Sequence, residues 1–368
     1  MKQNVLITGG AGFIGSHLAE KLQKKYNVII IDKLARRVHP IKKLVYIPKG
    51  VTFYKKDVND PKLLLKILPK IDYIYHLASH QDHLHDYSKF IENNVSSTSL
   101  IFEILTTLKK KRLKQFILAS SQSVYGDGYV ISRGKQYHAS RKVTNLKKKI
   151  WHVKSKNEKI KPHKESDEPR PIGFYGLSKF FQENIVKQCC KDNNIYYTIL
   201  RYSIVQGARQ SFFNSYSGLC RNLITSYIKG KQPIIYEDGN SIRDFVNIND
   251  VTNANLMILN NQNAFNQIFN IGGGKNYSLI DFNERVKTAL NIHNIKPIIN
   301  KSFRLNDPRY TVSNISKINK LIKWKPKKQI DSSINEYINW INNKLKYLKY
   351  ADDSLKVMKK TGTVIDCN

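Results

Sequence analysis

Cysteine and long apolar runs are scarce in this sequence of 368 residues. None of the four cysteines has C-x-x-C spacing, and two of them, Cys189 and Cys190, are adjacent, which excludes a disulfide framework and a zinc finger. No apolar run reaches the roughly 18 residues that a membrane-spanning helix needs. The first ten residues lead directly into an expected strand and carry no signal-peptide pattern. We therefore expect a cytoplasmic protein without a membrane span.

Acidic residues are also few: 28 Asp and Glu stand against 62 Lys and Arg, which gives a net charge of +34. Such a charge can indicate a protein that binds nucleic acid or an acidic membrane. Residues 129–164 hold twelve basic residues and one acid, Glu158, so that +11 lies there and +23 is spread over the rest of the chain. This spread favours a basic surface that steers an anionic small molecule, and we expect no nucleic-acid partner.

Short apolar runs alternate with longer segments of helical period through the first half of the chain. The runs lie at 5–7, 28–31, 51–54, 73–77, 116–119 and 196–200. They are almost continuously apolar, as strands are when both faces of a parallel sheet are covered. The helical segments between them include 14–25, 89–109 and 177–190. This alternation predicts an α/β fold, a Rossmann-type doubly wound parallel sheet with right-handed crossovers.

The pattern changes twice along the chain. Residues 128–168 are basic and poor in aliphatic side chains, which indicates an insertion between the fifth strand and the next helix. After Arg201 the segments become longer and looser, as in a smaller C-terminal lid domain that binds substrate, and a late strand at 267–271 is expected to return to the main sheet. The predicted division is a sheet domain of 1–202 plus 242–272, a substrate-binding domain of 203–241 plus 273–347, and an unassigned tail of 348–368.

A glycine motif follows the first expected strand and opens the first expected helix. Gly9 permits a tight turn, Gly12 lets backbone amides approach a pyrophosphate, and Gly15 allows close packing of helix on strand. The next strand ends at Asp32, 17 residues after Gly15, where a carboxylate can bond ribose hydroxyls and would repel a 2′-phosphate. NAD is therefore the predicted cofactor, although two arginines four and five residues after Asp32 leave NADP open.

A second cluster contains groups suited to proton transfer. Tyr175 and Lys179 are four residues apart and share one face of an expected helix. A lysine ammonium lowers the pKa of a nearby tyrosine, which makes a phenolate base plausible. Ser120 and Ser121 end the fifth strand, at the carboxyl edge where such sheets bind ligands. The alternative is a surface Tyr/Lys pair without function, because 21 tyrosines make chance matches common.

Taken together, the motifs resemble the extended short-chain dehydrogenase/reductase family, in its NAD-dependent nucleotide-sugar epimerase/dehydratase branch. The resemblance covers about residues 3–345 and depends on TGGAGFIGSHL, HLA from His76, NNV from Asn93, SSQSVYG, YGLSK, LRY from Leu200 and RDFV from Arg243. Within the branch, the insertion before YGLSK and the segment EDGNSIRDFV are similar to those of the dTDP-L-rhamnose 4-epimerases, and the UDP-glucose 4-epimerases are also similar.

The resemblance implies roles for individual residues. Those implied to be catalytic are Ser121, Tyr175 and Lys179. Those implied at NAD, together with the glycine motif, are Gly9, Gly12, Phe13, Ile14, Gly15, Asp32, Lys33, Asp57, Val58, Leu77, Ala78, Ser79, Asn94, Ala119, Tyr175, Lys179 and Tyr202. Those implied at a nucleotide-diphosphate sugar are His80, Ser120, Ser121, Gln122, Arg209, Asn214, Arg243 and Arg304.

The sequence departs from relatives at a few positions. Ile204 replaces an asparagine that relatives usually carry near the substrate phosphates. Gln122 and Ser123 stand where 4,6-dehydratases have Asp and Glu. The segment SHQDHLHDY holds His80, His83 and His85, which could supply a second acid or base, whereas their spacing fits no common metal-ligand pattern. We expect no metal.

The predicted function is C4 epimerisation of a dTDP- or UDP-hexose through a transient 4-keto sugar. The alternatives are an NAD(P)-dependent 4-keto-sugar reductase, a 4,6-dehydratase, and a protein that binds a dinucleotide or nucleic acid without catalysis. The resemblance also implies a homodimer, formed by the helices around 89–109 and 177–190.

Overall fold

The computed structural model describes residues 2–82, 84–213, 218–350 and 354–367. Its main sheet has seven parallel strands in the order β13-β9-β5-β4-β1-β2-β3. The strands are β1 (Asn4–Thr8), β2 (Asn27–Ile31), β3 (Thr52–Tyr54), β4 (Tyr73–His76), β5 (Gln115–Ser121), β9 (Tyr196–Tyr202) and β13 (Gln267–Ile271). The predicted Rossmann-type sheet is confirmed, including the return of the late strand, which pairs with β9.

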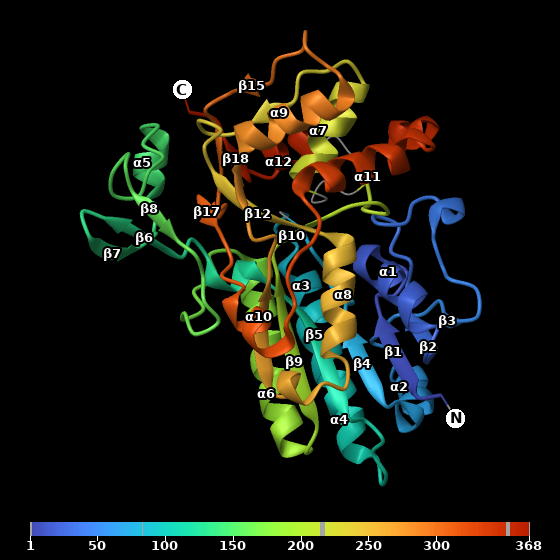
Figure 1. Ribbon diagram of the computed structural model, residues 1–368. Helices are drawn as coiled ribbons and strands as arrows, with labels where there is room; N and C mark the ends of the chain where they lie inside the picture. The colour runs from blue at the N-terminus through green and yellow to red at the C-terminus, as the bar shows by residue number, and fades with distance from the viewer. Residues whose placement is uncertain (1, 83, 214–217, 351–353, 368) are drawn as a thin grey trace.

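Helices cover both faces of this sheet, because alternate strand residues point to opposite sides and both sets are apolar. Val5 and Ile117 pack into a core on one face with α1 (Phe13–Leu22), α8 (Ile248–Ile258) and α10 (Ser316–Ile322). Leu6 and Phe116 pack on the other face. The helices there are α2 (Pro61–Ile67), α4 (Ser97–Thr107) and α6 (Phe174–Asp192). Figure 1 shows these layers in the lower half of the molecule.

The prediction of one continuous α-helix at 89–109 is wrong, because a π-helical segment interrupts it. The structure has α3 (Tyr87–Phe90), a π-helical segment η3 (Ile91–Ser96) and then α4. The wider π turn contains the buried Asn94, whose side chain bonds to a neighbouring loop and to α6. Residue spacing alone cannot reveal this interruption, and such π segments often occur at functional sites.

A smaller body lies above the carboxyl edge of the sheet (Figure 1). Its apolar core is formed by α7 (Leu219–Ile228), α9 (Leu279–Leu290) and α11 (Ile330–Asn342). Its strands are β10 (Ile204–Gln206), β11 (Ile234–Ile235), β12 (Ile242–Asn247), β14 (Asn276–Ser278), β15 (Ile298–Ile299) and β17 (Tyr310–Thr311). Within this smaller body, β12 pairs with β10, β14 and β17. The predicted division into domains stays a prediction.

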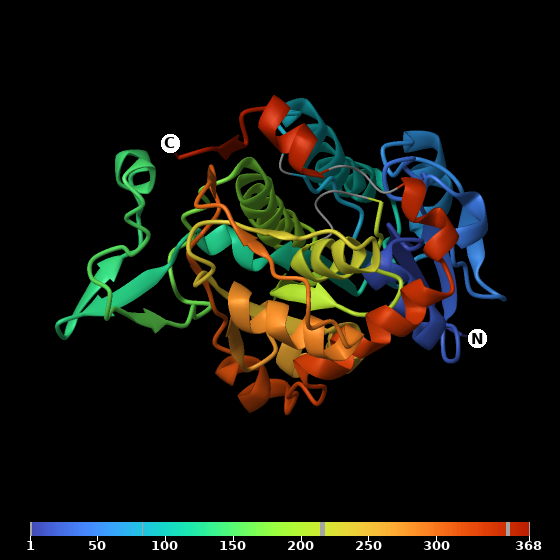
Figure 2. The same ribbon diagram turned by 90° about the horizontal axis from the view of Figure 1, so that it is seen from above.

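The insertion and the tail both contain regular structure. In the insertion, β6 (Tyr129–Ser132) pairs antiparallel with β7 (Lys135–His138) and β8 (Lys159–Lys161), and α5 (Val143–Lys147) follows β7. Figures 1 and 2 both show this unit projecting from one side of the molecule. In the tail, α12 (Ser354–Lys360) precedes β18 (Val364–Ile365), which pairs with β16 (Phe303–Arg304). Short 3-10 helices complete the structure: η1 (Lys42–Leu44), η2 (Leu68–Lys70), η4 (Gln122–Tyr125), η5 (Gln262–Ala264) and η6 (Leu345–Tyr350).

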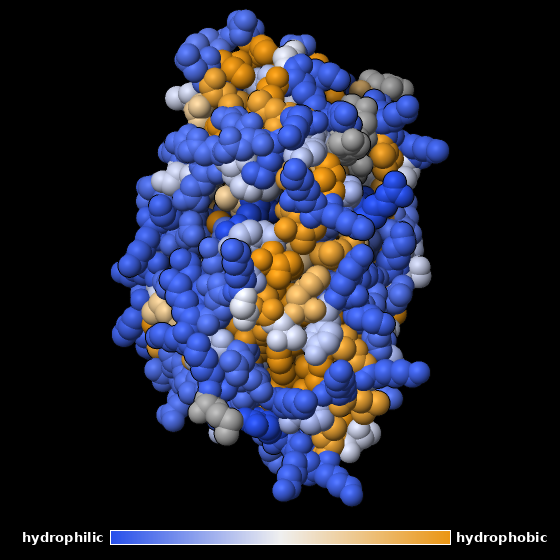
Figure 3. Space-filling model, turned by 90° about the vertical axis from the view of Figure 1, so that its right-hand side faces the viewer, coloured by the Kyte–Doolittle hydropathy of each residue, from blue (hydrophilic) through white to orange (hydrophobic). Residues whose placement is uncertain are grey.

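The surface reflects the basic composition. Figure 3 shows one face that is largely hydrophilic, with hydrophobic side chains gathered in a central band. Among the described helices, none combines the length and the apolar character needed to cross a membrane.

Candidate active site

A cavity of about 1270 Å³ lies between the carboxyl edge of the main sheet and the smaller body. It brings together nearly all of the residues predicted for the site. Those on its wall are Gly9, Gly12, Phe13, Ile14, Gly15, Asp32, Lys33, Asp57, Val58, Leu77, Ala78, Ser79, His80, Ala119, Ser120, Ser121, Gln122, Tyr175, Lys179, Tyr202, Arg243 and Arg304. Ile204 also lies on the wall.

The glycine turn between β1 and α1 fits a dinucleotide pyrophosphate. Gly9 has a φ of +69°, and a Cβ there would lie 2.8 Å from the Ala78 nitrogen. A Cβ at Gly15 would lie 2.5 Å from the Gly9 carbonyl oxygen, so both positions exclude larger residues. Helix α1 starts without a side-chain cap, and its first residues, Phe13 and Ile14, lie on the cavity wall. The first turn of α1 is thus suited to bind an anion.

Two carboxylates mark the predicted adenosine end. Asp32 accepts hydrogen bonds from the Ala11 nitrogen at 3.1 Å and the Leu34 nitrogen at 2.9 Å, which fixes its carboxylate on the cavity wall. The Lys33 ammonium pairs with Asp57 at 2.9 Å. The residues therefore fit NAD: an anion site at α1 and a fixed carboxylate at the end of β2, as ribose recognition requires.

Asn94 is predicted to line the NAD site, but the structure does not place it on the cavity wall. The side chain is fully buried, and its Oδ1 accepts a hydrogen bond from the His80 nitrogen at 2.6 Å. Its Nδ2 donates to the Ser178 hydroxyl on α6 at 2.9 Å. Asn94 thus ties the loop after β4, which does line the cavity, to the helix that carries Tyr175.

Tyr175 and Lys179 occupy successive turns of α6 on the face toward the cavity. The Lys179 ammonium donates to the Ala119 carbonyl at 2.9 Å and lies 5.9 Å from the centre of the Tyr175 ring. Burial lowers the pKa of Lys179 to about 7, although the nearby Glu183 carboxylate opposes this shift. Lys179 is therefore a buried amine beside Tyr175 whose charged form Glu183 favours.

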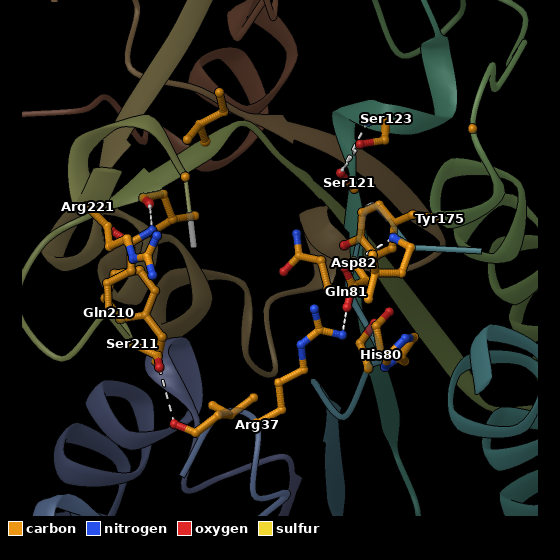
Figure 4. A pocket seen from close by; sticks show the side chains of 18 of the residues that line it. Arg37, His80, Gln81, Asp82, Ser121, Ser123, Tyr175, Gln210, Ser211 and Arg221 are labelled. Atoms are coloured by element: carbon orange, nitrogen blue, oxygen red, sulfur yellow. Dashed lines mark hydrogen bonds and ion pairs between the residues drawn. The ribbon is translucent and has the colours of Figure 1, made fainter. Parts of the chain in front are cut away.

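Ser121 ends β5 beside this pair. Its hydroxyl donates to the Ser123 hydroxyl at 3.0 Å and accepts from the Ser123 nitrogen at 3.1 Å. Figure 4 shows Ser121, Ser123 and Tyr175 around one part of the cavity. The predicted substrate residue Ser120 also reaches the wall, but its hydroxyl donates to Glu183 at 2.6 Å. Its side-chain donor is thus committed within the protein.

The histidines differ in environment. His76 is fully buried between the hydroxyls of Thr8 and Thr98, at 2.8 and 3.0 Å, and burial lowers its pKa to about 3. This is a packed, neutral histidine. His80 lies on the cavity wall with its Nε2 3.2 Å from Asp86, and burial lowers its pKa in spite of that carboxylate. His83 lies outside the described residues.

His80, Asp82 and Asp86 place their ligand atoms within 4.8 Å of one another. Both carboxylates already have cationic partners: Arg37 pairs with Asp82, and Lys89 with Asp86 at 3.1 Å. Figure 4 shows Arg37 reaching toward Asp82 across the cavity. The cluster gives no support for a metal, and the expected absence of one stays a prediction.

Two of the predicted arginines lie on the part of the cavity wall that the smaller body forms. Arg243 pairs with Asp307 at 3.0 Å, and Arg304 pairs with the same carboxylate while lying 5.3 Å from the centre of the Tyr236 ring. Guanidinium groups in this arrangement suit a diphosphate. Sequence reasoning missed Tyr236 and Asp307; the position of Asp307, three residues after Arg304, was the available signal.

Two predicted substrate residues are not brought to this wall. Arg209 pairs with Glu20 at 2.6 Å and stacks on the Tyr46 ring at 3.7 Å from its centre. It does not line the cavity, because these contacts hold it against α1 and the loop after β2. Asn214 lies outside the described residues.

The fold and the site define a class of enzyme: a Rossmann-type protein with a serine, a tyrosine and a lysine at the carboxyl edge of its sheet, facing a cationic wall. Residues 5–272 match the family described as the NAD dependent epimerase/dehydratase family, and the chain belongs to it. NAD is the cofactor of this family, and the glycine turn and Asp32 fit it.

Several relatives span nearly the whole chain. A putative UDP-glucose 4-epimerase of Methanocaldococcus jannaschii is 30% identical over 92% of this chain and 98% of its own length. The dTDP-L-rhamnose 4-epimerase of Burkholderia thailandensis is 29% identical over 93% of this chain and 96% of its own. The crystal structure of the Bacillus cereus UDP-glucuronic acid 4-epimerase with UDP-glucuronic acid and NAD has a TM-score of 0.74 at 25% identity, covering 93% of this chain and 99% of that one.

Proposed function

We propose that the protein is an NAD-dependent nucleotide-sugar 4-epimerase that acts on a UDP- or dTDP-hexose. The observation that carries this proposal is the placement of Ser121, Tyr175 and Lys179 at one end of a cavity whose other wall presents Arg243 and Arg304. A nucleotide sugar can contact both parts of the cavity at once: its sugar reaches Ser121 and Tyr175 while its diphosphate binds the two arginines. The relatives named above support the choice of reaction.

In the proposed mechanism, Tyr175 removes the proton of the sugar 4-hydroxyl, and the Ser121 hydroxyl turns from Ser123 to donate a hydrogen bond to the 4-oxygen as it becomes a carbonyl. Lys179, held by the Ala119 carbonyl, stabilises the Tyr175 phenolate by its charge. NAD, when bound, supplies the acceptor and donor of the C4 hydrogen. Tyr175 then returns its proton to the 4-oxygen of the inverted sugar. The reaction has no net redox change, so we expect the cofactor to stay bound between turnovers.

Gln122 is proposed as a substrate contact. Gln122 is 6% exposed on the cavity wall, and its Oε1 has no hydrogen-bond partner among the described atoms. A buried acceptor without a partner costs free energy, and a sugar hydroxyl would satisfy it. This amide also argues against a dehydratase, because it cannot transfer protons near neutral pH.

The carboxyl groups of the cavity support the same distinction. Among the described wall residues, each of the four carboxylates is already held by a cation or by backbone amides. They are Asp32, held by two amides, Asp57 by Lys33, Asp82 by Arg37 and Asp307 by Arg243. Elimination of water from C5 and C6 requires an acid and a base in addition to the group at C4, and these paired carboxylates are poorly suited to either role.

Turnover in heavy water tests this proposal. A C4 epimerase moves its hydrogen between C4 and the cofactor, so we expect UDP-glucose or dTDP-L-rhamnose to reach equilibrium at C4 with no deuterium on any sugar carbon. NMR and mass spectrometry of the recovered sugar provide the measurement. Deuterium at C5 or C6 together with loss of water would show dehydration. Deuterium at C3 or C5 without loss of water would show that the histidine-rich segment 79–87 supplies a second acid or base. Stoichiometric consumption of NADH would show a reductase.

We also propose a homodimer built on α3, η3 and α6. These elements contact one another, and Ile91 on η3 and Phe181 on α6 are 39% and 44% exposed. Large apolar side chains gathered on neighbouring helices commonly mark an interface. Light scattering should therefore give the mass of a dimer.

The variant Phe181→Asp places a charge in this face and should give a monomer that retains NAD. Leu65→Asp on α2 is the matched control, because Leu65 is equally exposed, at 50%, and lies on a different helix. A dimeric Phe181→Asp protein, or a monomeric wild type, would contradict the proposed interface.

A further inference from the structure

The C-terminal segment 354–367 reaches the cavity from the side of Arg304. Met358 on α12 and Thr363 before β18 both lie on the cavity wall, with 5% and 4% of their surface exposed. In Figure 1, α12 and β18 lie in the upper part of the molecule, above the main sheet. The tail therefore borders the part of the cavity that is remote from the glycine turn.

Backbone pairing fixes the tail against the strand that carries Arg304. Val364 pairs with Arg304 and Ile365 with Phe303 across β16 and β18. The Leu305 nitrogen donates to the Thr363 carbonyl at 3.0 Å. Thr363 therefore flanks the same strand whose guanidinium faces the diphosphate position of the proposed substrate.

Side chains reinforce this attachment. Asp366 accepts a hydrogen bond from the Ser302 hydroxyl at 2.7 Å and pairs with Lys359 at 2.8 Å. These contacts join α12, β18 and the residue before β16 into one unit.

The insertion packs on the same strand. Leu146 and Trp151 pack with Phe303, and Ile365 and Cys367 of the tail join this cluster. Arg141 pairs with Glu237 at 2.9 Å and donates to the Asp307 carbonyl at 2.6 Å. The two segments that sequence reasoning left without a role thus meet at β16 and support the cationic wall together.

We propose that residues 354–367 form one wall of the nucleoside subsite, with Met358 as its apolar contact to the nucleotide. This inference rests on the proposed function, which places a nucleoside diphosphate at Arg243 and Arg304. A thioether is a suitable neighbour for an aromatic base, because its polarisable sulfur makes favourable contacts with ring edges. Tyr236 lies on the same wall, with Arg304 over its ring.

Titration of the full-length protein, with its NAD bound, against UDP and dTDP tests the inference. Met358→Ala should raise the Kd of the nucleotide that wild type binds by about tenfold, or 1.4 kcal/mol. Its NAD content should stay close to wild type, because Met358 does not contact the glycine turn, whereas its melting temperature should fall because Met358 is only 5% exposed. Lys360→Ala on the same helix is the matched control, since Lys360 is exposed, and its Kd should match wild type.

A chain that stops after residue 353 should show at least the same loss of nucleotide affinity. If this truncation fails to fold, as judged by lost NAD and the absence of a cooperative melt, the nucleotide Kd of Met358→Ala is the test of the inference. Wild-type affinity in Met358→Ala, or an equal loss in Lys360→Ala, would overturn the tail assignment and leave the proposed function standing. A wild type that binds neither nucleotide would overturn the proposed function and this inference with it.

Discussion

Replacement of Tyr175 by phenylalanine is expected to lower epimerase turnover by about two to four orders of magnitude. The change removes the ionisable phenol and keeps the ring that packs near Lys179. Proton removal from the 4-hydroxyl then has no base in position, while the glycine turn and Asp32 remain intact. NAD binding and the nucleotide Kd should therefore stay near their wild-type values, so that the loss appears in kcat and not in KM.

Single-turnover and steady-state rates with UDP-glucose or dTDP-L-rhamnose measure this effect. Tyr196→Phe is the matched control: Tyr196 is 47% exposed at the start of β9, at the edge of the sheet opposite the site. Turnover of Tyr175→Phe within a few fold of wild type would exclude Tyr175 as the base. An equal fall in Tyr196→Phe would show that the assay reports damage to the fold.

Of the substitutions proposed here, removal of the Glu183 carboxylate should lower the free energy of unfolding the most. Glu183 is fully buried and forms two hydrogen bonds, at 2.9 and 2.7 Å, with Arg201, which is 2% exposed. Burial disfavours the charge on Arg201, but the bonds to Glu183 keep the pKa of this guanidinium above its ordinary value. Glu183→Ala would leave that charge buried without its partner, at a cost of about 3–5 kcal/mol in the free energy of unfolding.

The loss should extend to the site, because Glu183 joins α6 to β5 through Ser120 and to β9 through Arg201. Urea denaturation measures the change. The double variant Glu183→Leu with Arg201→Met should recover much of the stability, because no lone charge remains. Glu168→Ala, which breaks the exposed pair with Arg170, should change little. A stable Glu183→Ala protein, or a double variant no better than the single one, would contradict this account.

The parts of the site that could be predicted depend on local signals. The glycine turn, Asp32 and the Tyr175–Lys179 pair each lie next to a strand or within one helix, where chain geometry alone fixes their positions. Arg209 and Asn94 show the limit of this reasoning. The direction of Arg209 depends on Glu20, 189 residues earlier, and the role of Asn94 depends on a π turn and on Ser178, 84 residues later.

The tail shows the same limit for the fold. Strand β18 has two residues and pairs with another two-residue strand, β16. Neither has a period that can be recognised in the sequence, and the two pair only with each other in a two-stranded sheet. The insertion was located by its composition, but its packing on Phe303 depends on contacts between segments far apart in the chain.

The position of Met358 and Thr363 also has a consequence for the order in which the site is assembled during translation. The main sheet is complete once β13 has been synthesised, at Ile271. Met358 and Thr363, which also form part of the cavity wall, are synthesised 87 and 92 residues later. Because domains fold as units from the N-terminus during synthesis, the main sheet can form on the nascent chain before this part of the cavity wall has been made.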